Sequence, residues 1–198
     1  MANPILRGFR SLGSFSGRDP AGDFWPYAGV VLIAVFAFAA VAMPLAMQGM
    51  FADMQQFAAE HPEATTVQQS PTSYSISIDA GHPDAPQLDM SNLFLVLGGV
   101  VALAAILLAA AVSRRLHDGN RPAWFGLAPL IFLTAGLVLF PRMMDDFMGS
   151  SEPNMGLFGL LFLNNILYLI TLLALVVQCI QKGTTGPNRY GPEPEPRI

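Results

Sequence analysis

The sequence has few charged residues and a single cysteine. Only 12% of its 198 residues are charged, which is about half the share that soluble domains usually carry, whereas 53% are hydrophobic. This balance predicts that lipid rather than water surrounds most of the chain. The lone cysteine, Cys179, excludes a framework of intramolecular disulfides. The chain also lacks an extended basic stripe, which argues against binding of bulk nucleic acid.

Four stretches contain no Asp, Glu, Lys, Arg or His. Each approaches the roughly 20 apolar residues that a helix needs to cross a bilayer core, where only a helix satisfies its own backbone groups. They are residues 27–47, 93–112, 123–140 and 157–180. No small-x-small cleavage site follows the first stretch, so we expect it to be retained. The sequence therefore predicts an all-α membrane protein built as a bundle of four transmembrane helices.

Basic residues are missing from the long connection between the first two stretches, residues 48–92, which carries six acidic residues. If the chain crosses the membrane four times, nine of its ten basic residues lie on one side and only Arg142 lies on the other. Lys and Arg favour the cytoplasmic side of a membrane. We therefore expect both termini in the cytoplasm and residues 48–92 as a long acidic loop outside.

The first residues of the chain carry a helical pattern of their own. Ile5, Leu6, Phe9 and Leu12 recur at helical spacing with Arg7 and Arg10 between them, which predicts a short helix lying in the inner headgroup region. A mobile tail is the alternative. We expect a single membrane domain, residues 1–198. Its segments are a cytoplasmic amphipathic segment (1–26), four spans (27–47, 93–112, 123–140, 157–180), two outer loops (48–92, 141–156), a cytoplasmic loop (113–122) and a cytoplasmic tail (181–198).

The long outer loop contains one short alternating pattern. Tyr74, Ile76 and Ile78 alternate with serines, as in a half-buried strand. A small cap with one hairpin and a disordered segment around residues 61–71 are both compatible with this composition.

Three polar segments fall on the expected inner side. They are residues 15–25 (FSGRDPAGDFW), 114–124 (RRLHDGNRPAW) and 183–192 (GTTGPNRYGP). In this order and between these stretches, they closely resemble the domain-of-unknown-function 805 family of small bacterial inner-membrane proteins. The resemblance covers nearly the whole chain, although the first segment lacks a second basic residue often seen in the family and the outer loop is longer. It implies a helical bundle in the bacterial inner (plasma) membrane with a periplasmic outer loop, and it supplies no activity.

We expect the polar side chains of these segments to gather in one layer at the inner interface. The candidates are Arg18, Arg114, Arg115, His117, Asp118, Asn188 and Arg189. Their first possible role is to anchor the topology, with Asp118 pairing with arginines. Their second is an anion site for a phosphate-bearing lipid or small ligand. An enzyme with His117 as its base and Asp118 as the orienting group is less expected, because neither a nucleophile nor a metal site is evident nearby.

The fourth stretch carries a polar helix face, formed by Asn164, Tyr168, Thr171 and Gln178. Such a face turns away from lipid, where it either bonds helices together or lines a polar pathway. A pathway needs matching polar residues on other spans, which are scarce, and an ion-coupled transporter usually needs ionisable ones. A non-enzymatic membrane bundle is therefore our leading hypothesis, and a small-solute transporter or channel subunit is the alternative.

A methionine stripe marks the outer end of the first stretch: Met43, Met47, Met50 and Met54. Thioether sulfur suits Cu(I), but methionine also fills gaps between helices, and no compact ligand motif is present. We predict no metal and no cofactor. The expected partners are the lipid bilayer, including anionic phospholipid, and a second copy or another membrane protein.

Overall fold

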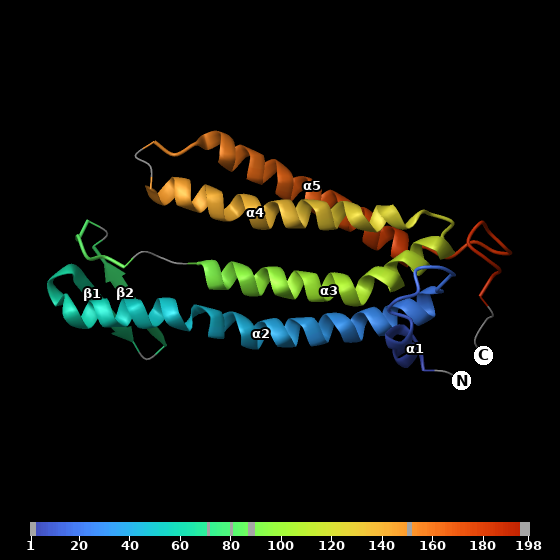
Figure 1. Cartoon of the computed structure of the whole chain (residues 1–198), viewed down its shortest axis with the longest axis horizontal. Helices are drawn as coiled ribbons and strands as arrows, with labels where there is room; N and C mark the ends of the chain where they lie inside the picture. The colour runs from blue at the N-terminus through green and yellow to red at the C-terminus, as the bar shows by residue number, and fades with distance from the viewer. Residues whose placement is uncertain (1–2, 71, 80, 87–89, 150–151, 195–198) are drawn as a thin grey trace. The chain divides into compact units, whose positions relative to one another are not determined.

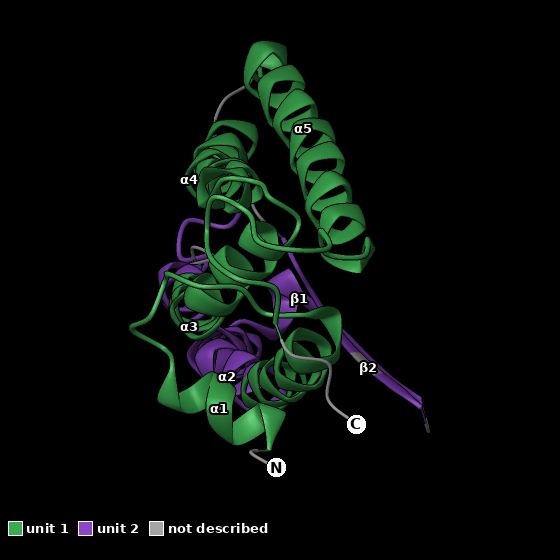
Figure 2. Cartoon of the chain, turned by 90° about the vertical axis from the view of Figure 1, so that its right-hand side faces the viewer, with its two compact units in different colours: residues 1–38, 98–198 green, residues 39–97 purple. Residues whose placement is uncertain are grey.

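The structure is a computed structural model, and it describes residues 3–70, 72–79, 81–86, 90–149 and 152–194. Figure 1 shows a mostly helical chain that contains one two-stranded hairpin. It forms two compact units, residues 1–38 with 98–198 and residues 39–97 (Figure 2). In chain order the elements are α1 (Pro4–Arg10), α2 (Ala21–Glu60), the 3₁₀-helix η1 (Pro62–Ala64), β1 (Thr65–Ser70), β2 (Ser73–Ile78), α3 (Ser91–Asp118), η2 (Ala123–Gly126), α4 (Leu127–Gly149) and α5 (Met155–Ile180).

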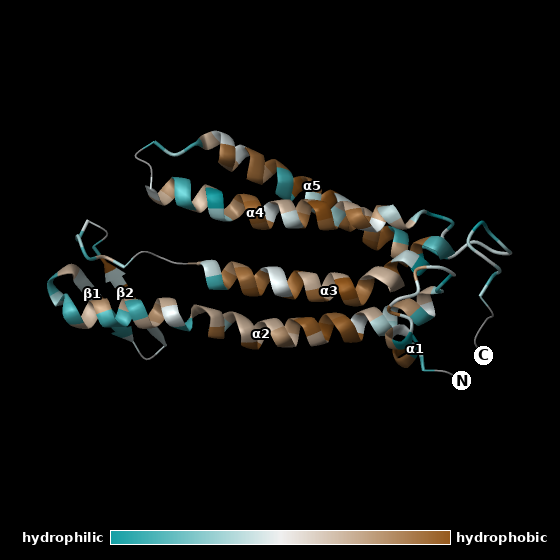
Figure 3. Ribbon diagram, in the orientation of Figure 1, coloured by the Kyte–Doolittle hydropathy of each residue, from teal (hydrophilic) through white to brown (hydrophobic). Residues whose placement is uncertain are grey.

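Four helices of the described chain are long and apolar enough to cross a membrane: α2, α3, α4 (with η2) and α5. Figure 3 shows hydrophobic residues along these helices and hydrophilic residues in the hairpin and connections. Their apolar side chains are largely uncovered, as with Ile33 at 72% exposure and Leu173 at 64%. Soluble monomeric proteins rarely expose so large a continuous apolar surface to water. The four helices therefore indicate a multi-pass membrane protein.

The helices run past the ends of the uncharged stretches. Helix α2 continues to Glu60, and α3 continues through the Arg-Arg-Leu-His-Asp segment to Asp118. A helix can continue from the hydrocarbon core into water, so the point where the sequence becomes polar does not mark the end of α2 or α3. The expected loop at 113–122 is thus helical in its first half and turns at residues 119–120. Residues 195–198 of the expected tail lie outside the described residues.

The apolar core of the first unit lies where the start of α2 meets the end of α3. Tyr27 and Val31 of α2 and Leu116 of α3 are each 1% exposed, and the Tyr27 hydroxyl donates to the carbonyl of Leu107 at 2.6 Å. Helix α1 packs on this core through Phe9, whose ring contacts the Tyr27 ring edge-on with the ring centroids 5.2 Å apart. Gly8 permits this approach, because any side chain at that position would overlap the Tyr27 ring. A short N-terminal helix is therefore present.

Helices α4 and α5 pack side by side as an antiparallel pair (Figure 1). Asn154 caps α5, because its side-chain oxygen accepts from the Gly156 amide at 2.9 Å. The Asn154 amide in turn donates to Asp146 of α4 at 2.5 Å. These bonds satisfy backbone groups that a helix end leaves unpaired.

The second unit contains the hairpin, which lies in the connection between α2 and α3. Strands β1 and β2 pair antiparallel, from Thr65 opposite Ile78 to Ser70 opposite Ser73. Ile76 and Ile78 are half-buried, while Ser75 and Ser77 are exposed, which follows the alternation in the sequence. Of the two alternatives for this loop, the structure contains the hairpin.

Candidate functional site

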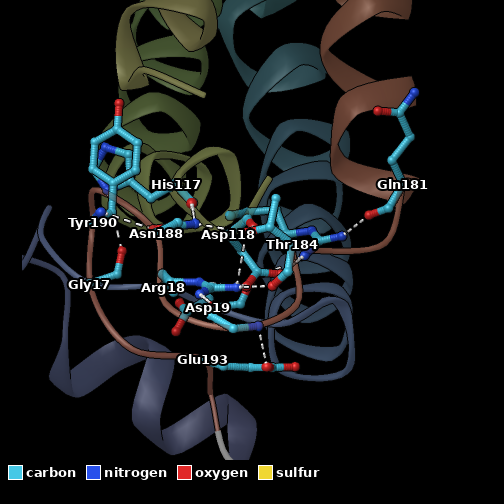
Figure 4. A network of polar contacts seen from close by, with 12 residues as sticks. Gly17, Arg18, Asp19, His117, Asp118, Gln181, Thr184, Asn188, Tyr190 and Glu193 are labelled. Carbon is cyan, nitrogen blue, oxygen red and sulfur yellow. Dashed lines mark hydrogen bonds and ion pairs between the residues drawn. The ribbon is translucent and has the colours of Figure 1, made fainter. Parts of the chain in front are cut away.

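Three segments far apart in the sequence meet at one polar cluster in the first unit (Figure 4). They are residues 7–23, which run from α1 through the connection into α2, then the last two turns of α3, and the chain after α5. We call the group of Arg7, Arg18, Arg114, Arg115, Asp19, Asp23 and Asp118 the arginine–aspartate cluster. All of these residues except Arg7 are buried, with exposures from 1% to 6%.

Arg18 connects all three segments. Its Nε donates to Asp118 Oδ1 at 3.1 Å, and its two terminal nitrogens donate to the carbonyls of Gly186 at 2.8 Å and Thr184 at 2.5 Å. Thr184 itself bonds back to α3, since its amide donates to the Asp118 carbonyl at 2.9 Å. Figure 4 shows Arg18 between Asp118 and the Thr184 segment. The guanidinium is therefore engaged by protein on each of its nitrogens.

Arg115 closes the end of α5. Its Nη1 donates to Asp118 Oδ2 at 2.6 Å, its Nε donates to the carbonyl of Cys179 at 2.9 Å, and its Nη2 donates to the carbonyl of Gln181. Carbonyls at a helix C-terminus lack intrahelical partners and carry partial negative charge, so a cation is stabilised there. No sequence pattern indicates this capping, because it depends on how α3 and α5 meet.

Arg114 faces the N-terminal segment. Its Nε donates to Asp19 Oδ2 at 2.7 Å, and its Nη1 donates to the carbonyls of Ser11, at 2.8 Å, and Ser14. Arg7 of α1 completes the group with bonds to Asp19 at 2.8 Å and to Asp23 at 2.6 Å.

Arg7, Asp19, Asp23 and Thr184 were missed by the sequence reasoning. A signal was available for the acids, because three arginines removed from water require carboxylate partners. The segments 1–26, 113–122 and 181–198 together contain only five acids: Asp19, Asp23, Asp118, Glu193 and Glu195.

His117 lies beside the cluster and packs against the tail. Its ring stacks on Tyr190 with centroids 3.8 Å apart and planes at 9°, and its Nδ1 lies 3.3 Å from the Gly17 carbonyl. Neighbouring residues on a helix point about 100° apart, and Asp118 accordingly faces Arg18 and Arg115. Among the described hydrogen bonds, none joins His117 to Asp118. A base held by an adjacent carboxylate is therefore not formed here.

Asn188 and Arg189 hold the tail against the end of α3. The side-chain amide of Asn188 donates to the His117 carbonyl at 3.0 Å and to Thr184 Oγ1 at 2.9 Å. Arg189 donates to the Asn120 carbonyl at 3.2 Å and lies 4.7 Å from the centre of the Tyr190 ring. All seven candidate residues that were expected to gather in one layer thus lie in or beside one cluster.

A cavity of about 460 Å³ opens next to this cluster. Its walls carry charges of both signs, from Arg7, Arg18, Asp23 and Glu193, together with the Tyr190 ring. Both arginines also bond to carboxylates or carbonyls of the protein. The cavity is consequently polar without a strong preference for anions.

The polar face of α5 is used within the protein at two positions. Asn164 is 7% exposed, and its side-chain amide donates to the Phe132 carbonyl of α4 at 3.0 Å. Thr171 donates to the Leu167 carbonyl of its own helix at 2.8 Å. Tyr168 and Gln178 are half-buried, and Gln178 Oε1 is a buried oxygen without a described partner. The face therefore supplies one described bond between helices.

Comparison with known proteins agrees with the motifs. Residues 12–192 match the family described as "Protein of unknown function (DUF805)", and this range includes all three polar segments. No curated protein and no solved structure matches the chain. The resemblance inferred from the motifs is confirmed: the chain belongs to the DUF805 family of proteins of unknown function.

Proposed function

We propose that this chain is a non-enzymatic membrane protein whose arginine–aspartate cluster locks the cytoplasmic ends of its helices into a fixed platform. Exposed cations around that platform contact the phosphates of anionic lipids. The observation that carries the proposal is the set of bonds to Arg18, Arg114 and Arg115. Their guanidinium groups are engaged by carboxylates and carbonyls of the protein, which favours a lock over a ligand site.

The orientation in this proposal has both termini in the cytoplasm. It is supported by the sorting of basic residues along the chain, because nine of ten fall in segments that share one side after four crossings. The cluster then lies at the inner surface, where α1 would rest in the headgroup layer. Leu6 and Phe9 of α1 are 55% and 42% exposed, which suits contact with lipid.

The energetics of buried charge explain why such a cluster acts as a lock. The seven groups hold four cations and three carboxylates, so together they carry one net positive charge. Removing one partner from a buried pair leaves an uncompensated charge and costs about 3–5 kcal/mol. The three segments are therefore expected to hold together or to separate together.

Lipid phosphates are expected at the rim of the cluster instead of inside it. Arg10, Lys182 and Arg189 are exposed in the segments that meet there, and Trp124 offers a 60% exposed ring. A basic residue near an anionic leaflet contributes about 1 kcal/mol of attraction. Aromatic rings of this kind settle at the headgroup level.

Native mass spectrometry and thermal unfolding of the same variants distinguish the structural role of the cluster from lipid binding by the exposed cations around it. We expect Arg10→Gln with Lys182→Gln to reduce retention of phosphatidylglycerol while the melting temperature stays unchanged. We expect Arg115→Gln to lower the melting temperature. If Arg114→Gln and Arg115→Gln instead remove bound phosphatidylglycerol without loss of stability, these arginines bind lipid directly and the lock is wrong.

A further inference from the structure

The second unit brings together three side chains that the proposed function does not use. His61 follows α2 directly, Glu63 lies in η1, and His82 follows β2. One ligand atom from each of them lies within 4.8 Å of the other two. His61 Nδ1 is 3.2 Å and His82 Nε2 is 4.0 Å from the same oxygen, Oε1 of Glu63.

We infer that His61, Glu63 and His82 form a binding site for one divalent transition-metal ion, with Zn²⁺ as the best match. Two imidazole nitrogens and one carboxylate oxygen are a recognised zinc ligand set that leaves a fourth position for water. With Zn–ligand bonds of about 2.0–2.2 Å, tetrahedral geometry places ligand atoms roughly 3.3 Å apart. The separation of 3.2 Å matches this value, while the others, 4.0 Å and at most 4.8 Å, need side-chain rotations to close the site.

The backbone around the three residues already holds them in position. The His61 carbonyl accepts from the Ala64 amide at 3.1 Å and from Thr65 Oγ1 at 2.9 Å, which fixes the turn between α2 and β1. After the end of β2, the His82 amide donates to the Asp79 carbonyl at 3.1 Å. The pairing of β1 with β2 brings these two turns to the same end of the hairpin.

An aromatic ring forms the floor of the site. Phe57 of α2 is 5% exposed, and its ring lies 4.8 Å from that of His61 and 5.5 Å from that of His82. The two imidazole rings are 4.6 Å apart. Their side chains retain exposures of 25% and 23%, and Glu63 retains 65%. The ligands are thus supported from one side and open to water on the other.

Charge in this part of the chain favours a cation. Residues 48–92 contain six acids and no Lys or Arg, so no basic side chain of this segment competes with a metal ion. Nitrogen and oxygen donors also suit Zn²⁺ better than Cu(I), which prefers thiolate and thioether sulfur. The site therefore differs in chemistry from a copper site built on the nearby methionine stripe.

Metal binding has one structural consequence within the second unit. The Asp84 amide now donates to His82 Nδ1 at 3.3 Å. When Nε2 binds a metal, the proton of a neutral imidazole resides on Nδ1, so this contact must open. The ion would replace it with a link between the end of α2 and the segment after β2, which braces the hairpin.

Zinc titration of the full chain tests the site. The protein is stripped of metal with a chelator, placed in phosphatidylcholine nanodiscs and titrated with Zn²⁺ by calorimetry. We expect one ion per chain. Because loss of an outer partner of a metal ligand already costs about 10- to 100-fold in affinity, His61→Ala and His82→Ala should each weaken binding by more than tenfold. Glu60→Gln removes a neighbouring charge outside the ligand set and is the matched control for Glu63→Gln.

Two further measurements keep the result independent of folding. Zn²⁺ should raise the melting temperature of the wild type but not of His82→Asn, while the metal-free melting temperatures of the two should agree. Co²⁺ in the wild type should give the intense visible absorption of a four-coordinate ion. Binding no stronger in the wild type than in the His61→Ala/His82→Ala double variant overturns the proposal. An equal loss in Glu60→Gln and Glu63→Gln also overturns it, because it would reduce the effect to diffuse charge.

Discussion

The two units use charged side chains in opposite ways. In the first unit, Arg115 is 1% and Asp118 is 3% exposed, and the donors of the arginine are bonded to Asp118 and to carbonyls at the end of α5. In the second unit, Glu63 and two histidines face one another while water reaches them from outside. The arginine nitrogens of the first arrangement are bonded within the protein, whereas in the proposed metal site His82 Nε2 lies 4.0 Å from Glu63 Oε1, too far for a hydrogen bond. Polarity alone thus does not identify a ligand site, whereas the number of uncommitted donors or acceptors does.

The largest expected effect is on stability and comes from a substitution in the arginine–aspartate cluster of the first unit. Asp118→Asn leaves Arg18 and Arg115 buried without their shared carboxylate, so we expect a loss of about 3–5 kcal/mol in stability. Thermal unfolding in detergent measures it, with Asp145→Asn, an exposed acid of α4, as the control. Equal melting temperatures for the two variants would show that Asp118 does not hold the cluster.

A smaller effect is expected at the glycine that lies against Asp118. A side chain at Gly183 would overlap the Asp118 carboxylate, whereas Gly159 of α5 has open space around it. Overpacking of a filled site costs about 1–3 kcal/mol. We therefore expect Gly183→Ala to unfold at a lower temperature than the size-matched Gly159→Ala, and the reverse order would contradict the packing described here.

The polar face of α5 gives a third, weaker effect. Asn164→Leu removes the bond to the Phe132 carbonyl, and such bonds between membrane helices average about 0.6 kcal/mol. If the face only joins helices, liposomes with wild-type protein should show no more solute flux than empty ones. A wild-type flux across a solute panel that Asn164→Leu abolishes would support the transporter alternative instead.

The smallest effect concerns pH in the second unit. Hydrogen bonds from its own backbone amide and from His61 lower the pKa of Glu63 below its usual value. A carboxyl group with a lowered folded-state pKa stabilises the fold at pH values above its unfolded pKa, and this contribution is lost as the pH falls through the folded pKa. Protection factors for amide exchange at residues 61–66, which correct for the intrinsic pH dependence of exchange, should therefore fall in acid, and Glu63→Gln should remove that dependence. Unchanged pH dependence in the variant would exclude Glu63 as its source.

The sequence predicted the helices more reliably than their contacts. A long uncharged stretch in lipid can satisfy its own backbone hydrogen bonds only as a helix, so the four apolar helices followed from composition. The end of α3 did not follow, because Arg114 and Arg115 are as compatible with helix in water as with a loop. The role of Asp19 depends on the path of the α1–α2 connection, and no local pattern encodes that path.

The hairpin was only partly visible in the sequence. Strand β2 alternates isoleucines with serines, but β1 reads Thr-Thr-Val-Gln-Gln-Ser and lacks a clear apolar face. The pairing that brings His61 near His82 therefore could not be predicted from periodicity. Distant partners of this kind are set by strand register, which depends on the folded turn and the residues around it.

The most direct test of the central claim is a double-mutant cycle between Arg18 and Asp118, measured as free energies of unfolding. If the pair is part of a buried lock, Arg18→Met and Asp118→Leu should each destabilise the protein strongly. The double variant should lose less than the sum of the single losses, by about 0.5–3 kcal/mol. Strict additivity of the two losses would mean that these side chains do not act on each other, and the lock would be contradicted.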